Sequence, residues 1–172
     1  MDDLIVVVDY SSNWPILYEQ EKQRLLDAVG SDVADIQHVG STSVPGLAAK
    51  PIIDIAAVLR HFPPSMILIR ALEELGYLYQ GELGIAGRHF FRKGMPRTHH
   101  LHLVEANSEV WQKQLLFRDF LRAHPESAQR YDTLKRELAV QYSCDRKAYV
   151  NAKAPLIAEL LAAASEWKLR KL

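Results

Sequence analysis

Apolar residues follow two different patterns along this chain. Before residue 107, short apolar or alternating runs are separated by glycines and prolines, which is typical of strands and short helices joined by turns. After Asn107 glycine is absent and apolar residues recur every three to four positions, as they do in helices. The patterns predict one domain over residues 1–172, with an α+β core over 1–106 and a packed helical segment over 107–172.

The runs before residue 107 predict two helices between the strands. The first begins near Asn13-Trp14-Pro15, where Asn13 is suited to capping, and ends at Gly30. The second begins at Pro63-Pro64 and ends at Gly76. Strands are predicted at residues 4–8, 35–39, 52–59, 77–79, 89–92 and 100–104. In the second part, helices are predicted at residues 108–123, 126–143 and 146–168.

Charge is balanced over the whole chain but unevenly distributed. Residues 1–106 hold 9 Lys/Arg against 13 Asp/Glu, and residues 107–172 hold 12 against 8. The helical segment is therefore the better candidate for contact with an anion, although this excess is too small to predict general nucleic-acid binding. The apolar runs are too short to span a bilayer. The single Cys144 and the acidic start at Met1-Asp2-Asp3 lead us to expect a cytoplasmic protein of open oligomeric state.

The segment from His38 to Ile55 combines a Gly-Ser turn with an acid-bearing strand. Gly40 allows a phosphate to approach the backbone closely, and Ser41 and Thr42 supply hydroxyl groups. Taken alone, these three residues fit an ordinary turn better. The basic side chain of Lys50 and the acid that follows it favour a phosphate site.

The acid of this segment is Asp54, within the predicted strand over 52–59. Alternation along a strand turns Ile53 and Ile55 toward the core and Asp54 to the opposite face. A carboxylate among apolar neighbours needs a partner, because an unpaired charge there is costly. That partner is a metal, a base or a set of backbone donors, and a structural salt bridge to Lys50 is the alternative.

Three histidines follow one another closely in the strand predicted at 100–104 and just before it. Alternation places His100 and His102 on one face and His99 on the other. Two imidazoles at this spacing can share a metal ion, and an adjacent strand would add Asp54 as a third ligand. Two half-buried histidines satisfied by hydrogen bonds are the alternative interpretation.

Basic side chains are paired on the predicted helices. Arg118 and Arg122 lie four residues apart on one helix face, as do Tyr131 with Lys135 and Tyr149 with Lys153. Such residues can clamp a triphosphate, with the tyrosines stacking on a base. A solvated helix surface is the general alternative, although Arg118 is flanked by Phe117 and Phe120 and is expected beside a buried seam.

These motifs, in this order, resemble the GrpB family over nearly the full chain. They are Asn13-Trp14-Pro15, His38 to Thr42, Lys50 to Ile55, His100-Leu101-His102, Phe117 to Arg122, Tyr131 with Lys135, and Tyr149 with Lys153. The resemblance implies a polymerase-β-like nucleotidyltransferase fold: a mixed sheet with helices on one face, plus a C-terminal helical segment. It also implies phosphate binding at the Gly-Ser turn, Asp54 as the catalytic carboxylate, and transfer of a nucleotidyl group from a nucleoside triphosphate. Related domains fused to dephospho-CoA kinase hint at coenzyme metabolism.

One position departs from the pattern that this fold implies. Nucleotidyl transfer usually relies on two metal ions held by two or three carboxylates, and Ala56 stands where the second is expected. Magnesium prefers oxygen ligands, so Asp54 with His100 and His102 suits zinc or manganese better than magnesium. Two functions therefore remain open: a metal-dependent nucleotidyltransferase, and a non-catalytic module that binds a nucleotide or coenzyme.

Overall fold

The computed structural model describes residues 4–171 and has the expected mixed α+β architecture. Five strands form one sheet in the order β1-β2-β5-β4-β3. The central strands β2 and β5 are parallel, and the other neighbouring pairs are antiparallel. The strands are β1 (Val33–Val39), β2 (Ile53–Leu59), β3 (Tyr77–Tyr79), β4 (Arg88–Lys93) and β5 (His99–Val104).

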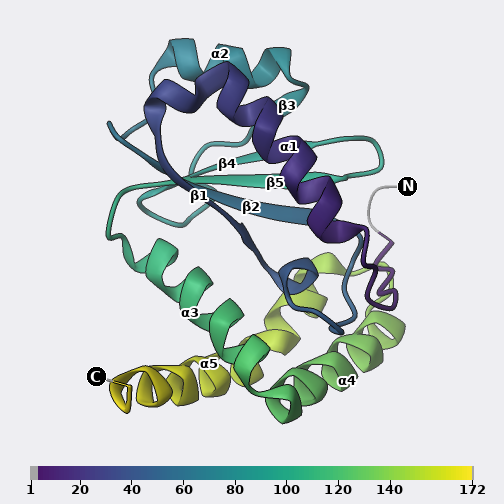
Figure 1. Ribbon diagram of the computed structural model, residues 1–172. Helices are drawn as coiled ribbons and strands as arrows, with labels where there is room; N and C mark the ends of the chain where they lie inside the picture. Colours follow the sequence, from purple (N-terminus) through teal and green to yellow (C-terminus); the bar gives the residue numbers. More distant parts are fainter. Residues whose placement is uncertain (1–3, 172) are drawn as a thin grey trace.

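Two helices cover one face of this sheet, as Figure 1 shows: α1 (Trp14–Val29) and α2 (Met66–Glu74). Between them and the sheet lies the main core, to which β2 contributes Ile53 and Ile55 and β5 contributes Leu101 and Leu103. The alternation predicted for 52–59 is thus realised. Asp54 points away from this core, because it lies between two core residues on an extended strand.

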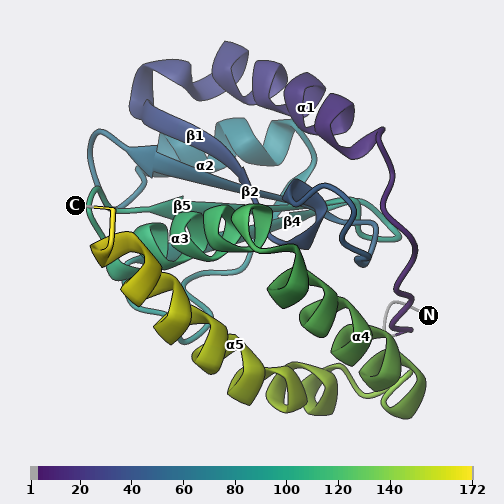
Figure 2. The ribbon, with the colours of Figure 1, turned by 60° about the horizontal axis from the view of Figure 1, so that its bottom comes forward.

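The remaining helices form a separate layer (Figure 2): α3 (Glu109–Ala123), α4 (Pro125–Gln141) and α5 (Arg146–Leu169). They pack on one another around Phe120, Tyr131 and Leu160. The loop between β1 and β2 adds Val44 and Leu47 to the same core, so this loop is held between the sheet and the helices. Within residues 4–171, the structure contains no helix long and apolar enough to cross a membrane.

Three local predictions are wrong, each for a physical reason. Residues 4–8 are not a strand and form only a single bridge, between Val8 and Ala49. Within this apolar run, Ile5 is buried against α4 and α5 instead of in the sheet. Asn13 makes no capping hydrogen bond with its side chain. The second helix begins at Met66 rather than at the prolines, because the Ser65 hydroxyl accepts from the amide of Leu68 and caps it there.

Candidate functional site

The candidate site lies at the sheet edge where β1 ends and β2 and β5 begin. Parallel pairing sets Asp54 opposite His100, and antiparallel pairing sets it opposite Val39 of β1. The Gly-Ser turn follows Val39 directly as a short 3₁₀ helix, η2 (Ser41–Ser43). The strand register therefore brings the Gly-Ser turn, Asp54 and His100 together, although they are distant in the sequence.

Asp54 is held by two imidazoles. Nδ1 of His100 donates a hydrogen bond of 3.0 Å to Oδ1 of Asp54, and Nε2 of His102 lies 3.6 Å from the same oxygen. Burial raises the pKa of the Asp54 carboxyl, but the contacts with both histidines outweigh it and hold that pKa well below its usual range. The side chain keeps 28 % of its surface exposed, so a carboxylate faces the adjoining cavity.

The side chains predicted to bind a metal contact one another directly, with Asp54 hydrogen-bonded to His100. Among residues 4–171, no group of three or more His, Cys, Asp or Glu side chains is placed to hold a metal ion. The nitrogens of His100 and His102 that approach Asp54 point at its oxygen, whereas zinc would sit about 2.0–2.2 Å from each donor atom. In this arrangement the residues do not fit a metal centre, and metal binding stays a prediction. His99 lies on the opposite face, where burial lowers the pKa of its imidazole and the nearby Glu21 opposes that shift.

The close contact with Asp54 requires a glycine at position 40, and the role of Gly40 in phosphate binding stays a prediction. The φ of Gly40 is +71°, and a Cβ added there would lie 2.6 Å from Oδ2 and 2.9 Å from Cβ of Asp54. The buried Thr42 hydroxyl donates to the carbonyl of Ile52 at 3.4 Å and accepts from Nε2 of His38 at 2.9 Å. The proton of Thr42 is therefore already used within the protein. Both predicted hydroxyl ligands line the cavity, and the Ser41 side chain is hydrogen-bonded to Tyr131.

The neighbouring His38 is neutral at physiological pH. Burial lowers its pKa to about 4, and its ring stacks on Tyr18 with the centroids 4.7 Å apart. Because the Thr42 hydroxyl gives its own proton to Ile52, the hydrogen bond assigns the imidazole proton to Nε2. His38 thus orients the turn that leads to the cavity.

A cavity of about 250 Å³ opens beside Asp54 and the turn, and its other wall is cationic. Four basic residues line it: Lys50 from the loop before β2, Lys135 from α4, and Arg146 and Lys153 from α5. Among the described residues that line this cavity, Asp54 is the one carboxylate. We name it the lysine pocket.

The lysines of this pocket are strongly desolvated. Burial lowers the pKa of Lys135 to about 7, and burial together with neighbouring cations lowers the pKa of Lys50 and of Lys153 to about 8. The ammonium groups lie over tyrosine rings: Lys135 is 4.7 Å from the centroid of Tyr131 and Lys153 is 4.5 Å from that of Tyr149. The rings give part of the stabilisation that water would otherwise supply.

The tyrosines therefore lie beneath the lysines, with Tyr149 only 1 % exposed and Tyr131 only 5 % exposed. They are not free platforms on which a base could stack. The loop that carries Lys50 is also tied to α4: the amide of Ala48 donates to Asp132 at 2.7 Å, and Nζ of Lys135 donates to the carbonyl of Ala48.

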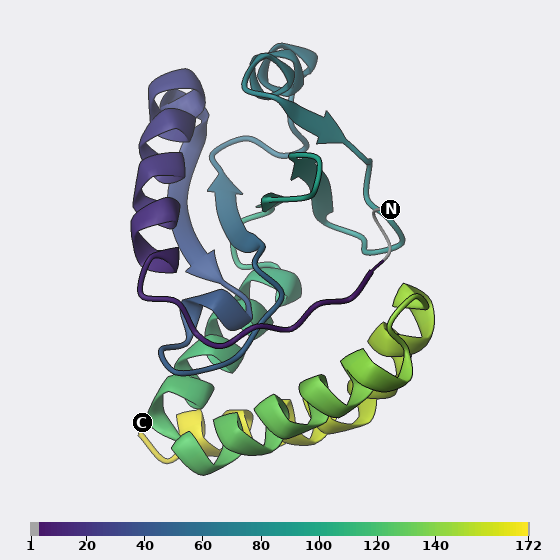
Figure 3. The same cartoon turned by 90° about the vertical axis from the view of Figure 1, so that its right-hand side faces the viewer.

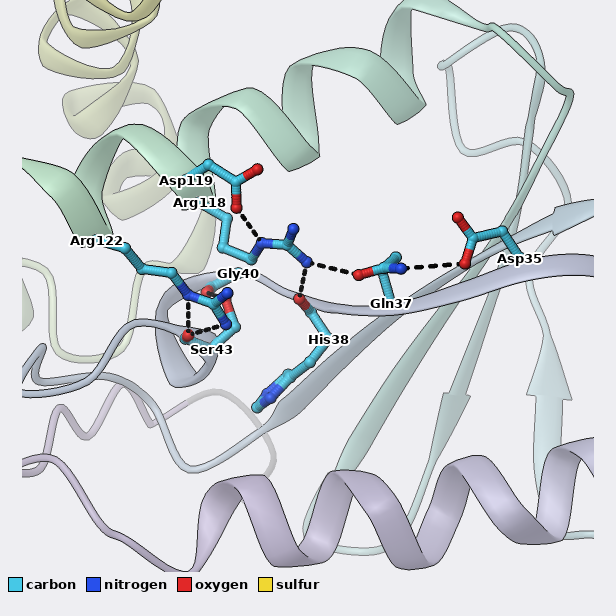
Figure 4. A network of polar contacts seen from close by, with 8 residues as sticks. All are labelled: Asp35, Gln37, His38, Gly40, Ser43, Arg118, Asp119 and Arg122. Carbon is cyan, nitrogen blue, oxygen red and sulfur yellow. Dashed lines mark hydrogen bonds and ion pairs between the residues drawn. The ribbon is translucent and has the colours of Figure 1, made fainter.

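Arg118 and Arg122 lie outside the lysine pocket, although the sequence predicted phosphate binding by Arg118. Figure 4 shows Arg118 in contact with the end of β1 and Arg122 in contact with the turn. Nη1 of Arg118 donates to the carbonyl of His38 and to Gln37, each at 3.0 Å. Nε and Nη2 of Arg122 donate to the carbonyl of Ser43 at 2.9 and 2.7 Å. Both arginines position the turn between α3 and the sheet.

Sequence reasoning missed Arg146 as part of the pocket. A signal was present, because Arg146, Tyr149 and Lys153 follow one another at spacings of three and four and so share a helix face. Arg146 is the first residue of α5, directly after the cap Asp145.

The fold and the site define a one-sheet α+β protein with a cationic pocket at the sheet edge. The chain belongs to the family described as GrpB protein, which matches residues 4–163. A crystal structure titled as conserved protein GrpB from Enterococcus faecalis superposes with a TM-score of 0.90 at 35 % identity, covering 95 % of this chain and 99 % of that one.

Two longer relatives contain a region similar to this chain. It is 38 % identical over 165 residues to UPF0157 protein YqkA of Bacillus subtilis, covering 95 % of this chain and 48 % of YqkA. It is 26 % identical over 180 residues to a protein named dephospho-CoA kinase from Mycolicibacterium paratuberculosis, covering 90 % of this chain and 44 % of that protein. The chain thus spans about half the length of each of these two relatives.

Proposed function

We propose that the lysine pocket binds the phosphate chain of a small molecule, with a nucleoside triphosphate as the leading candidate. The observation that carries the proposal is the convergence of Lys50, Lys135 and Lys153 with Arg146 on one cavity. Burial lowers the lysine pKa values most and repulsion among the neighbouring cations lowers them further, and an anion in the cavity offsets both effects. Ser41 and the ammonium groups would contact phosphate oxygens, and Arg118 would act only by positioning the turn.

The first form of this function is catalytic transfer of a nucleotidyl group to an acceptor. It is supported by the order of the site: a Gly-Ser turn after β1 and a carboxylate on the neighbouring strand β2, as in nucleotidyltransferase-like folds. Asp54 is ionised and partly exposed, so it would be the catalytic carboxylate of such a reaction. A divalent ion would supply further charge for the phosphates. The histidines would have to turn from their present hydrogen bonds to ligate that ion.

The second form is a non-catalytic nucleotide- or coenzyme-binding module. Ala56 favours it, because this residue is completely buried beside His102 where a second carboxylate is expected. The relative named dephospho-CoA kinase also favours a nucleotide-containing ligand. Both forms require the same cationic pocket and differ in whether the phosphate chain is cleaved.

The proposed function is tested first by binding. We expect tripolyphosphate and nucleoside triphosphates to raise the melting temperature of the wild type, and Lys153→Gln to lose most of that shift. Lys113→Gln is the matched control, since Lys113 is an exposed lysine on α3 paired with Glu109. The proposal fails if no polyphosphate stabilises the wild type, or if both variants respond alike.

Catalysis is then separated from binding by an assay of pyrophosphate release. Nucleoside triphosphates are incubated with candidate acceptors and Mg²⁺, Mn²⁺ or Zn²⁺. Release that depends on Asp54 supports the transferase, whereas binding without release for every pair supports the module.

A further inference from the structure

A second cavity of about 190 Å³ adjoins the lysine pocket. The two cavities share Lys50, Ile52 and Arg146 in their linings, so they meet along a common wall. The rest of the second lining is mainly aliphatic: Leu4, Val6, Pro51 and Pro96, with Arg97. We call this cavity the side compartment.

One wall of the side compartment is the extended segment that precedes α1. Figure 3 shows this segment crossing between the sheet and the helices α4 and α5. Ile5 is buried against Leu138 and Tyr149, and its amide donates to the carbonyl of Ser143 at 2.8 Å. Because side chains alternate along extended backbone, Leu4 and Val6 face the other way and line the compartment, where they are 62 % and 46 % exposed.

The opposite wall is the loop between β4 and β5, which is closely tied to the sheet. Gly94 has a φ of +93°, and a Cβ there would lie 2.6 Å from Oγ1 of Thr98. The amide of Thr98 donates to the carbonyl of Lys93 at 2.8 Å, and its carbonyl accepts from the amide of Ile53 at 2.9 Å. The wall formed by Pro96 is therefore fixed relative to the strand that carries Asp54.

We propose that the side compartment binds the uncharged organic group of the ligand whose phosphates occupy the lysine pocket. This inference rests on the proposed function and specifies its ligand. The lining favours an apolar surface on the ligand, because covering the exposed Leu4 and Val6 removes apolar area from water and lowers the free energy of the complex. Among the described residues the lining contains no carboxylate, so a cationic group is disfavoured there. A nucleoside and a branched alkenyl chain share the required chemistry, namely an apolar surface joined to a phosphate chain.

Three diphosphates distinguish the contributions of the two cavities. Calorimetry measures binding of inorganic pyrophosphate, ADP and isopentenyl diphosphate to the wild type at one pH. We expect ADP or isopentenyl diphosphate to bind about tenfold more tightly than pyrophosphate, the effect of removing roughly 55 Å² of apolar surface from water. The tighter of the two identifies the organic group as a nucleoside or an alkenyl chain.

Two variants test where the gain arises. Val6→Trp fills the side compartment from an exposed position, so we expect it to remove the tenfold gain and leave pyrophosphate binding unchanged. Ile67→Trp is the control, because Ile67 is 82 % exposed on α2, on the other side of the sheet. Equal affinities for the three diphosphates overturn the inference while the proposed function stands, as does a gain that persists in Val6→Trp. If none of the diphosphates binds while tripolyphosphate does, the inference fails and the proposed function stands; if tripolyphosphate also fails to bind, both proposals fail.

Discussion

Binding of a phosphate chain should weaken steeply as the pH rises from 7 to 8. Burial lowers the pKa of Lys135 to about 7, and the pKa values of Lys50 and Lys153 are lowered to about 8. A polyanion in the pocket favours the ammonium forms and raises these pKa values again. Each lysine that must gain a proton on binding therefore reduces the affinity above its pKa in the free protein.

The size of the effect follows from the three pKa values. At pH 7 about half of Lys135 and about nine tenths of Lys50 and Lys153 are protonated, and at pH 8 these fractions are about one tenth and one half. When all three must be protonated in the complex, the apparent association constant scales with the product of the fractions. That product falls about twentyfold between pH 7 and pH 8.

Titration calorimetry with tripolyphosphate measures this effect directly. Measurements at pH 8 in two buffers of different ionisation enthalpy should show uptake of about two protons on binding. Tripolyphosphate itself loses a proton on the alkaline side of this range, so its own titration is measured separately and subtracted. Lys153→Arg should reduce the uptake to about 1.4 protons, because a guanidinium stays charged. An affinity that is unchanged from pH 7 to 8, without proton uptake, would refute the assignment of these lysines to the ligand.

Three further predictions concern the frame around the pocket. Gly40→Ala should lower the free energy of unfolding by about 1–3 kcal/mol in urea titration, because its Cβ would collide with Asp54; an unchanged midpoint would contradict this. Arg122→Gln should weaken tripolyphosphate binding at every pH without changing the proton uptake, since it frees the turn at Ser43; an altered uptake would place Arg122 among the ligand contacts. If calorimetry detects Zn²⁺ or Mn²⁺ binding despite the present hydrogen bonds of the histidines, Asp54→Asn should reduce it and His99→Ala should not; equal binding by Asp54→Asn and wild type would remove Asp54 as a ligand.

Much of the sheet was predictable because its signals are local. The alternation of Ile53, Asp54 and Ile55 determines which side chain leaves the core, and glycines mark the ends of several elements. Alternation also brought His100 and His102 to the face of Asp54 once the strands proved adjacent. The extended segment was not predictable, because the burial of Ile5 depends on helices more than a hundred residues further along the chain.

The helical half of the site shows where local signals stop. A spacing of four places Arg118 and Arg122 on one helix face, but it does not say what that face meets. In the structure α3 lies beside the end of β1, so Arg118 donates to the carbonyl of His38 and Arg122 donates to the carbonyl of Ser43. Lys135 and Lys153 have the same spacing relative to a tyrosine, and their helices turn them toward the cavity instead. Only the packing of the helices separates the positioning residues from those that face a ligand.

The different positions of these cations have energetic consequences for the protein without its ligand. Arg118 and Arg122 donate to the carbonyl groups of His38 and Ser43, and Lys135 donates to that of Ala48. The pocket lysines are desolvated and repel one another, and their folded-state pKa values lie below the value of about 10.4 expected in an unfolded chain. Below pH 7 the full cost of these buried charges is present, and it is relieved as the pH rises toward 10, because the unfolded chain then binds more protons. A bound anion relieves the same cost at neutral pH, so the ligand should stabilise the contact between α4, α5 and the loop before β2.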